Sequence, residues 1–332
     1  MNLIIPMAGM GKRLRPHTLT TAKPLIPIAG KPIVQRLVQD IAKVTPEKIE
    51  KVGFIIGHFG DAVETQLLAI AESIGAEGQI IYQEEALGTA HAIYCAKELL
   101  QGKVSVAFAD TLFRAEFTLD TNQDGIIWVK EIKDPSAFGV VKTNEDGIIT
   151  EFVEKPKEPI SNKAIIGIYY FKQGENLRDE IQHLIDNNIR GGGEFQLTMA
   201  LESLKEKGTQ FSTGTVQDWL DCGNKNVTVE TNARYLTFIE DEELILSDTI
   251  ENSKIIPPVY IGAGAQIYDS TIGPGVSIGE NTIIKNSKVE HSLIQSGCIL
   301  EEVNLSNSML GNYVKVKNSK DELSLGDFSE IN

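Results

Sequence analysis

The last quarter of the sequence carries a short repeat that restricts the chain to very few backbone shapes. Apolar residues recur there at a spacing of five or six: Ile261, Ile267, Ile272, Ile278, Ile284, Val289, Ile294 and Leu300. Three of them are directly followed by a glycine, at Gly262, Gly273 and Gly279. A glycine-containing hexad is typical of a parallel β-helix, in which each hexad forms one side of a coil. An ordinary small β-domain is the alternative for this segment.

Residues 1 to about 240 show a different pattern, in which short β-rich runs alternate with helical stretches. Apolar residues at three-to-four spacing predict helices over 33–43, 61–73, 89–100, 177–187 and 195–207. Strands are predicted over 3–7, 52–57, 79–83, 104–109, 126–131, 138–143, 148–154 and 165–171. The early alternation implies an α/β fold with a mixed, mainly parallel, doubly wound sheet, and the later strands suggest an antiparallel insertion. We therefore predict two domains, 1–240 and 250–320.

The first predicted strand leads into a glycine-rich turn, Ala8-Gly9-Met10-Gly11, that is followed by positive charge. Lys12, Arg13, Arg15, Lys23 and Lys31 all precede the first acidic residue, Asp40. Glycines let backbone N–H groups approach an anion closely, and Arg13 and Lys23 could neutralise phosphate oxygens. Ligands of such sheets bind beyond the carboxyl ends of the strands, where Asp110 is also expected. The segment therefore predicts a nucleoside triphosphate site.

Composition excludes several other classes of function. The net charge of −15 argues against a nucleic-acid or anionic-membrane partner. Apolar runs fall well short of the ~20 residues that span a bilayer, and the N-terminus does not resemble a signal peptide. The three cysteines, Cys95, Cys222 and Cys298, lie far apart, which disfavours a disulfide or a thiolate metal site. We expect a cytoplasmic protein that binds a small anionic ligand.

The opening motif is long enough to carry a family resemblance. Gly9–Thr18 and Lys23–Pro32 match the pattern of the sugar-nucleotide pyrophosphorylases, with Ala22 where that family usually has proline. Residues 83–92, 107–110 and 218–223 resemble the base-reading loop and the two aspartate segments of the family. The resemblance implies a Rossmann-like nucleotidyltransferase domain followed by a left-handed β-helix. It also implies transfer from an NTP, UTP or dTTP, to a sugar 1-phosphate, with glucose 1-phosphate favoured and pyrophosphate released.

The resemblance also assigns roles to individual residues. Arg13 and Lys23 would be catalytic cations, and Asp110 and Asp221 would hold Mg²⁺. Nucleotide contacts would come from Ala8, Gly9, Met10, Gly11, Lys12, Gln83, Gly88 and Thr89. Sugar-phosphate contacts would come from Gly139, Glu154, Lys155, Gly167 and Tyr169. Simpler structural roles remain open for some of these: a strand cap for Gln83, a turn for Asp221, a surface ion pair for Glu154 and Lys155, and core packing for Tyr169.

Some positions depart from the family pattern, and other functions stay open. Glucose thymidylyltransferases typically carry an arginine two residues before the position of Glu194, whereas this chain has Gly192 there and Arg190 two residues earlier. Alternatives to the enzyme are a non-catalytic regulatory or assembly subunit, and a bifunctional enzyme with an acyltransferase tail that would use His291. We expect the tail to support assembly, which predicts a homo-oligomer.

Overall fold

The computed structural model describes residues 1–9, 11–115, 118–158 and 160–331. The chain forms two compact units whose division does not follow the order of the sequence. The first unit comprises Met1–Gly9 and Leu37–Trp219, and the second comprises Met10–Arg36 and Leu220–Asn332. The glycine-rich turn is therefore shared between the two units. The predicted boundary between domains 1–240 and 250–320 stays a prediction about independent folding.

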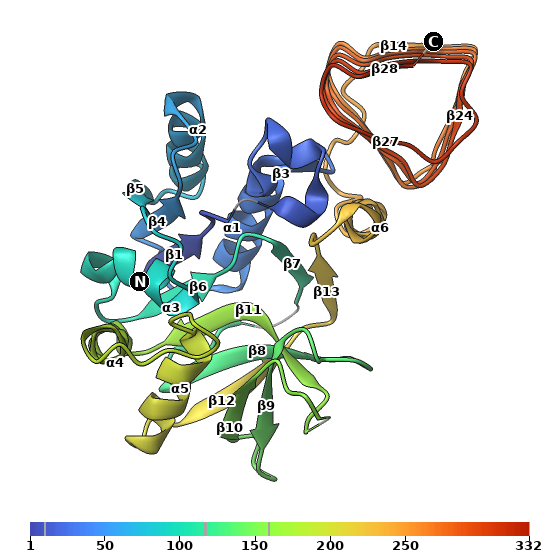
Figure 1. Ribbon diagram of the computed structural model, residues 1–332. Coiled ribbons are helices and arrows are strands. Elements are labelled where there is room, and N and C mark those ends of the chain that lie inside the picture. The colour runs from blue at the N-terminus through green and yellow to red at the C-terminus, as the bar shows by residue number, and fades with distance from the viewer. Residues whose placement is uncertain (10, 116–117, 159, 332) are drawn as a thin grey trace. The chain divides into compact units, whose positions relative to one another are not determined.

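The first unit is built on a nine-stranded mixed sheet with the order β10-β9-β11-β6-β1-β4-β5; in addition, β8 pairs with β11, and β12 pairs with β8 (Figure 1). Its parallel part comprises β1 (Asn2–Pro6), β4 (Lys51–Ile56), β5 (Glu77–Tyr82) and β6 (Val104–Ala107). The other strands are β8 (Gly125–Glu131), β9 (Gly139–Thr143), β10 (Ile149–Glu154), β11 (Lys163–Phe171) and β12 (Phe211–Thr215). Leu3, Ile4 and Ile5 of β1 are fully buried, as a central parallel strand covered on both faces requires.

Helices complete the α/β fold. They are α1 (Ile33–Val44), α2 (Asp61–Glu72), α3 (Thr89–Cys95), α4 (Gly174–Asp186) and α5 (Leu197–Glu206). Residues of α3, α4 and α5 share one hydrophobic core with the sheet, including Ile93, Leu177 and Leu201. The predicted helix over 89–100 ends its α-helical part at Cys95 and continues as a 3-10 turn, Lys97–Leu99. The predicted fold class is confirmed.

Several short elements were not predicted from the sequence patterns. Three 3-10 turns, Lys12–Leu14, His17–Leu19 and Lys23–Leu25, precede the short pair β2 (Pro27–Ile28) and β3 (Lys31–Pro32). β7 (Thr111–Arg114) pairs with β13 (Asp218–Asp221), and α6 (Lys225–Leu236) follows. These strands are too short to show a two-residue alternation, which explains why they were missed.

The C-terminal part is a parallel β-helix of three sheets (Figure 1). One sheet contains β14 (Thr249–Glu251), β17 (Gln266–Tyr268), β20 (Ile283–Lys285), β23 (Ile299–Glu301), β26 (Lys315–Lys317) and β28 (Glu330–Ile331). The second contains β15 (Lys254–Ile255), β18 (Thr271–Ile272), β21 (Lys288–Val289) and β24 (Asn304–Leu305). The third contains β16 (Val259–Ile261), β19 (Val276–Ile278), β22 (Leu293–Ile294), β25 (Met309–Leu310) and β27 (Ser324–Leu325).

The repeat predicted from the sequence forms the inside of this β-helix. All eight apolar repeat positions are buried, from Ile261 at 0% exposure to Ile294 at 1%. Stacked aliphatic side chains inside the coils supply the core that no single coil could form alone. The strands extend from Thr249 to Ile331, somewhat beyond the predicted 250–320. The three parallel sheets fit the left-handed β-helix that was predicted, and the ordinary β-domain is rejected.

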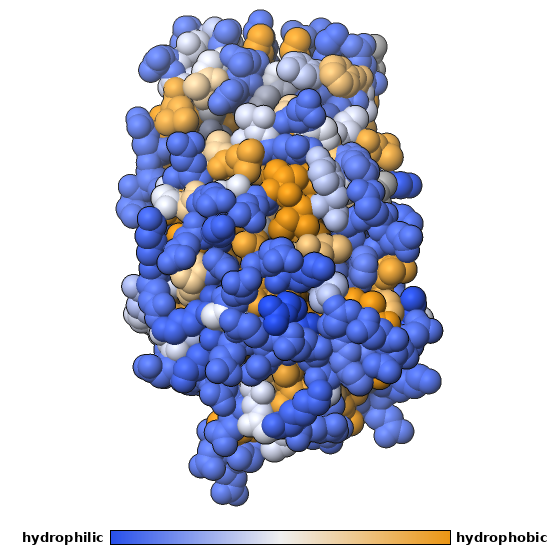
Figure 2. Space-filling model, turned by 90° about the vertical axis from the view of Figure 1, so that its left-hand side faces the viewer, coloured by the Kyte–Doolittle hydropathy of each residue, from blue (hydrophilic) through white to orange (hydrophobic). Residues whose placement is uncertain are grey.

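The surface agrees with the charged composition. Hydrophilic residues cover most of the face shown in Figure 2, and hydrophobic residues form smaller patches between them. Among the described residues, none of the helices has the length and apolar character that crossing a membrane requires.

Candidate functional site

Glu154 lies at the end of β10, opposite the first residue of β9. The register of these antiparallel strands pairs Glu154 with Gly139. Thr198, near the start of α5, donates a hydrogen bond of 3.2 Å from Oγ1 to the Glu154 carboxylate. A Cβ at position 139 would lie 3.2 Å from both the Glu154 carboxylate and the Thr198 methyl group. Gly139 therefore leaves room for an oriented carboxylate, and Thr198 is a contributor that the sequence patterns did not indicate.

Tyr169 and Asp110 belong to the same neighbourhood. Burial raises the pKa of the Tyr169 hydroxyl, and the negative charges of Glu154 and Asp110 raise it further. Gly167, at φ +85°, accepts a hydrogen bond of 2.9 Å from the N–H of Phe108, and this bond fixes the backbone two residues before Asp110. The predicted sugar-binding carboxylate, Glu154, and the predicted metal ligand, Asp110, therefore both lie near Tyr169 of β11. Tyr169 is 6% exposed and therefore packs in the core, whereas its contact with a sugar phosphate stays a prediction.

Lys155 directly follows Glu154 and presents a cation at the edge of this carboxylate group. Its backbone has a positive φ of 44°, and its N–H donates to the carbonyl of Phe138. The side chain is 65% exposed, and Nζ lies 4.0 Å from the Glu154 carboxylate. An exposed pair at this distance adds little to stability. The turn therefore holds the Lys155 side chain beside Glu154 without burying it.

Gly88 and its neighbours form the predicted base-reading region. Gly88 has a φ of +121°, and a Cβ there would lie only 2.5 Å from the carbonyl oxygen of Phe195. The Thr89 hydroxyl accepts a hydrogen bond of 2.9 Å from the N–H of Leu197. The side-chain amide of Gln83 lies 3.3 Å from Nδ1 of His91. The start of α3 is thus tied to the start of α5, and contacts of Gln83, Gly88 and Thr89 with a nucleotide stay predictions.

Arg190 is a further cation in this region. Its guanidinium lies 4.2 Å from the centre of the Phe195 ring, and Nη1 donates to the carbonyl of Gly193. Burial lowers the pKa of His91; the negative charge of Glu85 opposes this, and the positive charge of Arg190 adds to it. Arg190 therefore lies close to the Gly88–His91 region although it is displaced by two residues from the family's arginine. The family pattern, which has its arginine two residues before the position of Glu194, did not predict this location of Arg190.

The glycine-rich turn is divided between the units, whereas the cations that follow it all belong to the second unit. Ala8 and Gly9 follow β1 in the first unit, and Gly9 is exposed, with open space where a Cβ would point. Met10, a predicted nucleotide contact, lies outside the described residues. Gly11 has a φ of +58°, and a Cβ there would lie 2.8 Å from Cβ of Lys23. A side chain at position 11 would therefore displace a predicted catalytic residue.

In the second unit, Lys23 is buried at 7% exposure, whereas Lys12 and Arg13 are exposed on a 3-10 turn. Thr18 strengthens the turn by donating a hydrogen bond of 2.8 Å from Oγ1 to the carbonyl of Gly11. Gly11 lies against Lys23, and the contacts of Gly11, Lys12, Arg13 and Lys23 with a triphosphate stay predictions.

Asp221 ends β13 in the second unit. Its backbone carbonyl accepts a hydrogen bond of 2.6 Å from the Thr231 hydroxyl of α6. A Cβ at Gly223 would lie 2.8 Å from the Asp221 carboxylate, so the glycine leaves this carboxylate its space.

The donor types at Asp110 and Asp221 fit Mg²⁺, which is bound by one or two carboxylates and otherwise by water and phosphate oxygens. Among the described residues there is no group of three or more His, Cys, Asp or Glu side chains that could enclose a metal by itself.

Comparisons with known proteins show the family. Residues 3–237 match the family model described as nucleotidyl transferase. A glucose-1-phosphate thymidylyltransferase of Streptomyces antibioticus is 29% identical, with 100% of this chain and 99% of that protein covered. The low-salt glycan biosynthesis nucleotidyltransferase Agl11 of Haloferax volcanii is 30% identical over 98% of this chain and 96% of its own length.

Solved structures give the same fold. A UDP-glucose pyrophosphorylase solved with UDP-glucose superposes with a TM-score of 0.57 at 23% identity, covering 71% of this chain and 98% of that one. The family model spans most of the chain and includes both predicted aspartates and both predicted catalytic cations. The chain therefore belongs to the nucleotidyl transferase family of enzymes.

Proposed function

We propose that this protein is a sugar-1-phosphate nucleotidyltransferase, which joins an NTP to a sugar 1-phosphate and releases pyrophosphate. The observation that carries the proposal is the turn in which Gly11 packs against the buried Lys23, because it combines backbone N–H groups with a fixed cation. Near full-length similarity to enzymes named for this class of reaction supports it.

In this proposal the residues act by positioning and by charge, as nucleotidyl transfer requires. Arg13 and Lys23 would bind the triphosphate and stabilise the charge on the departing pyrophosphate. Glu154, oriented by Thr198, would accept hydrogen bonds from sugar hydroxyls, and Lys155 would neutralise the sugar phosphate. Asp110 and Asp221 would hold Mg²⁺, which supplies charge neutralisation on the phosphates when bound.

The identity of the two substrates is a more specific proposal. We propose glucose 1-phosphate, with dTTP or UTP as the nucleotide. The Streptomyces antibioticus relative is named as a thymidylyltransferase of glucose 1-phosphate, and this favours dTTP. The Arg190 guanidinium, beside Phe195 and near His91, is the cation that we propose to replace the family's arginine in this loop.

The test is a pyrophosphate-release screen of purified protein with Mg²⁺, in which each NTP is combined with a panel of hexose 1-phosphates. We expect the highest kcat/KM for dTTP or UTP with glucose 1-phosphate. Lys23→Ala should lose most of the turnover, whereas Lys43→Ala, which removes an exposed lysine paired with Asp40, should not. Absence of turnover with every pair would reject the enzyme and favour the regulatory or assembly subunit.

A further inference from the structure

The segment that carries Gly11, Arg13 and Lys23 belongs to the same compact unit as the β-helix. Its contacts with that C-terminal part are concentrated at two places, one on each side of Lys23. The first involves residues 16–20, and the second involves residues 28–36. Two fixed ends restrict the conformations of the chain between them, so these contacts bear on where Lys23 lies. Arg13 precedes the first place and is linked to it through the hydrogen bond from Thr18 to the carbonyl of Gly11.

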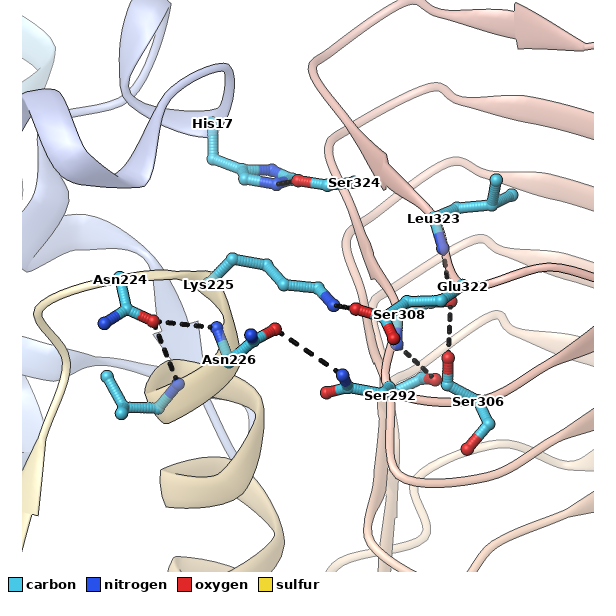
Figure 3. A network of polar contacts seen from close by, with 12 residues as sticks. His17, Asn224, Lys225, Asn226, Ser292, Ser306, Ser308, Glu322, Leu323 and Ser324 are labelled. Atoms are coloured by element: carbon cyan, nitrogen blue, oxygen red, sulfur yellow. Dashed lines mark hydrogen bonds and ion pairs between the residues drawn. The ribbon is translucent and has the colours of Figure 1, made fainter.

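At the first place, the 3-10 turn of His17 meets the last coil of the β-helix. His17, 4% exposed, lies with Nε2 3.1 Å from Oγ of Ser324 (Figure 3). Thr20 donates a hydrogen bond of 2.9 Å from Oγ1 to Asp327. Gly326, between them, packs so closely that a Cβ there would lie 3.1 Å from Cβ of Pro16. Three contacts therefore hold residues 16–20 against residues 324–327 of the last coil.

Asp327 is itself held by the preceding coil. Its Oδ1 accepts a hydrogen bond of 2.8 Å from the backbone N–H of Asn312, and its Oδ2 lies 3.3 Å from the Asn312 amide. The carboxylate therefore has a fixed direction before it meets Thr20. An ion pair between Lys225 of α6 and Glu322 joins the same coil to the helix that follows Asp221 (Figure 3).

At the second place, a buried asparagine joins the segment to the β-helix. Asn232 of α6 is fully buried and accepts hydrogen bonds from the N–H of Ala29, at 3.0 Å, and from the Ser277 hydroxyl, at 2.7 Å. Arg36, 2% exposed, donates to Glu242 and to the carbonyl of Ala29. Residues 28–36 are held by many contacts. Residues 16–20 are held by a few contacts, each of which a single substitution can remove.

We propose that Asp327 and Ser324, in the last coil of the β-helix, are positioning residues for the triphosphate-binding turn. Asp327 holds Thr20 and Ser324 holds His17; Thr18, between these two, in turn holds the carbonyl of Gly11. The β-helix thus acts on the reaction through the cations Arg13 and Lys23 without touching the substrate. This inference rests on the proposed function for its kinetic consequence, and its structural consequence can be tested separately.

The kinetic test compares Asp327→Ala and Thr20→Val, which remove the same hydrogen bond from opposite sides. We expect each to raise the KM for the NTP about fivefold, the effect of one lost hydrogen bond, with the KM for the sugar 1-phosphate unchanged. The double variant should be no worse than Asp327→Ala alone, because Thr20→Val removes a hydrogen bond that Asp327→Ala has already removed. Thr20→Val leaves the β-helix intact, so it remains informative if Asp327→Ala folds poorly.

Two further variants complete the design. Ser324→Ala should raise the NTP KM, and Ser324→Thr, which keeps the hydroxyl, should restore it. Glu330→Gln removes the exposed ion pair with Lys315 in the same terminal coil and serves as the matched control, with both KM values unchanged. Unchanged NTP KM values in Asp327→Ala and Thr20→Val, or equal rises in both KM values, would overturn the inference.

Hydrogen–deuterium exchange separates this inference from the proposed function. Peptides covering residues 11–25 should exchange faster in Thr20→Val and Asp327→Ala than in wild type or Glu330→Gln. If wild type shows no turnover with any substrate pair, the proposed function fails, but faster exchange would still support the anchoring. Equal exchange in all variants would overturn the anchoring even if the enzyme is active.

Discussion

A single hydroxyl group decides how the Glu154 carboxylate is presented. Thr198 is buried, it lies 44 residues from Glu154 in sequence, and its Oγ1 donates to the carboxylate. Gly139 supplies the space, because a Cβ there would press on both groups. A carboxylate held in this way needs no rearrangement to accept a hydrogen bond from a sugar hydroxyl.

Thr198→Val tests this role, since valine keeps the shape of threonine but cannot donate. We expect the KM for the sugar 1-phosphate to rise about fivefold, as for one lost hydrogen bond, while the NTP KM stays constant. Steady-state kinetics with each substrate varied in turn give the two constants. Ser203→Ala on the same helix removes a hydroxyl bonded to Glu180 and should change neither; a rise in both constants for Thr198→Val would contradict the assignment.

Gly88→Ala should be strongly destabilising. The new Cβ would lie 2.5 Å from the Phe195 carbonyl oxygen, at a φ of +121° that L residues rarely adopt. The strained backbone alone costs about 1–3 kcal/mol, and the clash adds to this. Gly208→Ala is the control, because φ there is +99° but nothing lies within 4 Å of the Cβ. Urea unfolding should show a larger loss for Gly88→Ala; equal losses would mean that α3 and α5 can separate readily.

His17 should make the stability of the protein fall in mild acid. Burial lowers its pKa to about 4; the charge of Asp327 opposes this shift and that of Lys225 adds to it. Because the unfolded chain binds the proton near pH 6.5, stability is full above that pH and decreases as the pH falls toward 4. The loss reaches at most ~3 kcal/mol. Urea unfolding of His17→Gln from pH 7.5 to 4.5 should show a weaker pH dependence than wild type; parallel curves would contradict the role of His17.

At the scale of elements, α6 connects the end of β13 to the β-helix. Its N-cap is Asn224, whose side-chain oxygen accepts hydrogen bonds from the N–H groups of Asn226 and Val227. Thr231 on the same helix holds the carbonyl of Asp221, and Asn232 contacts both Ala29 and Ser277. One short helix therefore sets the positions of a predicted metal ligand and of the cation-bearing segment.

Asn224→Ala should destabilise the protein by about 1 kcal/mol, because two N–H groups at the start of α6 lose their partner. Asn224→Ser retains a capping oxygen and should cost much less. Thermal unfolding of both variants provides the measurement. A similar loss for alanine and serine would show that the cap hydrogen bonds do not stabilise α6.

At the scale of the whole molecule, the β-helix completes the unit that contains Gly11, Arg13 and Lys23. Tyr260 of β16 packs on Gly30, where a Cβ would lie 2.2 Å from the ring, and Ser277 supports Asn232. These contacts would be lost without the β-helix. Whether exposed coil edges also pair protomers into a homo-oligomer stays a prediction.

A truncation at Asp248 should therefore lose most nucleotidyl transfer activity and lower the Tm by several degrees. The buried Asn232 would lose Ser277 and Gly275 as partners, and the segment from Gly11 to Arg36 would lose its support. Pyrophosphate release and scanning calorimetry of the truncated and full chains give the comparison. Full activity in the truncated protein would contradict this role, and analytical ultracentrifugation of the same pair tests the predicted homo-oligomer.

Repeating patterns in the sequence predicted the two architectures of this protein. The hexads predicted aliphatic side chains inside the β-helix, and the strand–helix alternation predicted the α/β class. Both predictions were possible because the period of the apolar residues indicates which face of an element is buried. Gly11 and Lys23 of the opening motif lie side by side in the structure, and their binding of a triphosphate stays a prediction. Short elements such as β7 and β13 left no period to detect.

Only the tertiary structure decided which distant residues meet. His17 and Ser324 are 307 residues apart, and Thr198, Arg190 and Asn232 reach the predicted groups from elements that the motifs did not include. Each is a common polar residue whose contribution depends on the partners it meets in the fold, so its local sequence does not reveal that contribution. The amino-acid sequence fixed the two architectures through their periods; the joining of the triphosphate-binding turn to the β-helix arose from packing, because contacts between distant segments have no period.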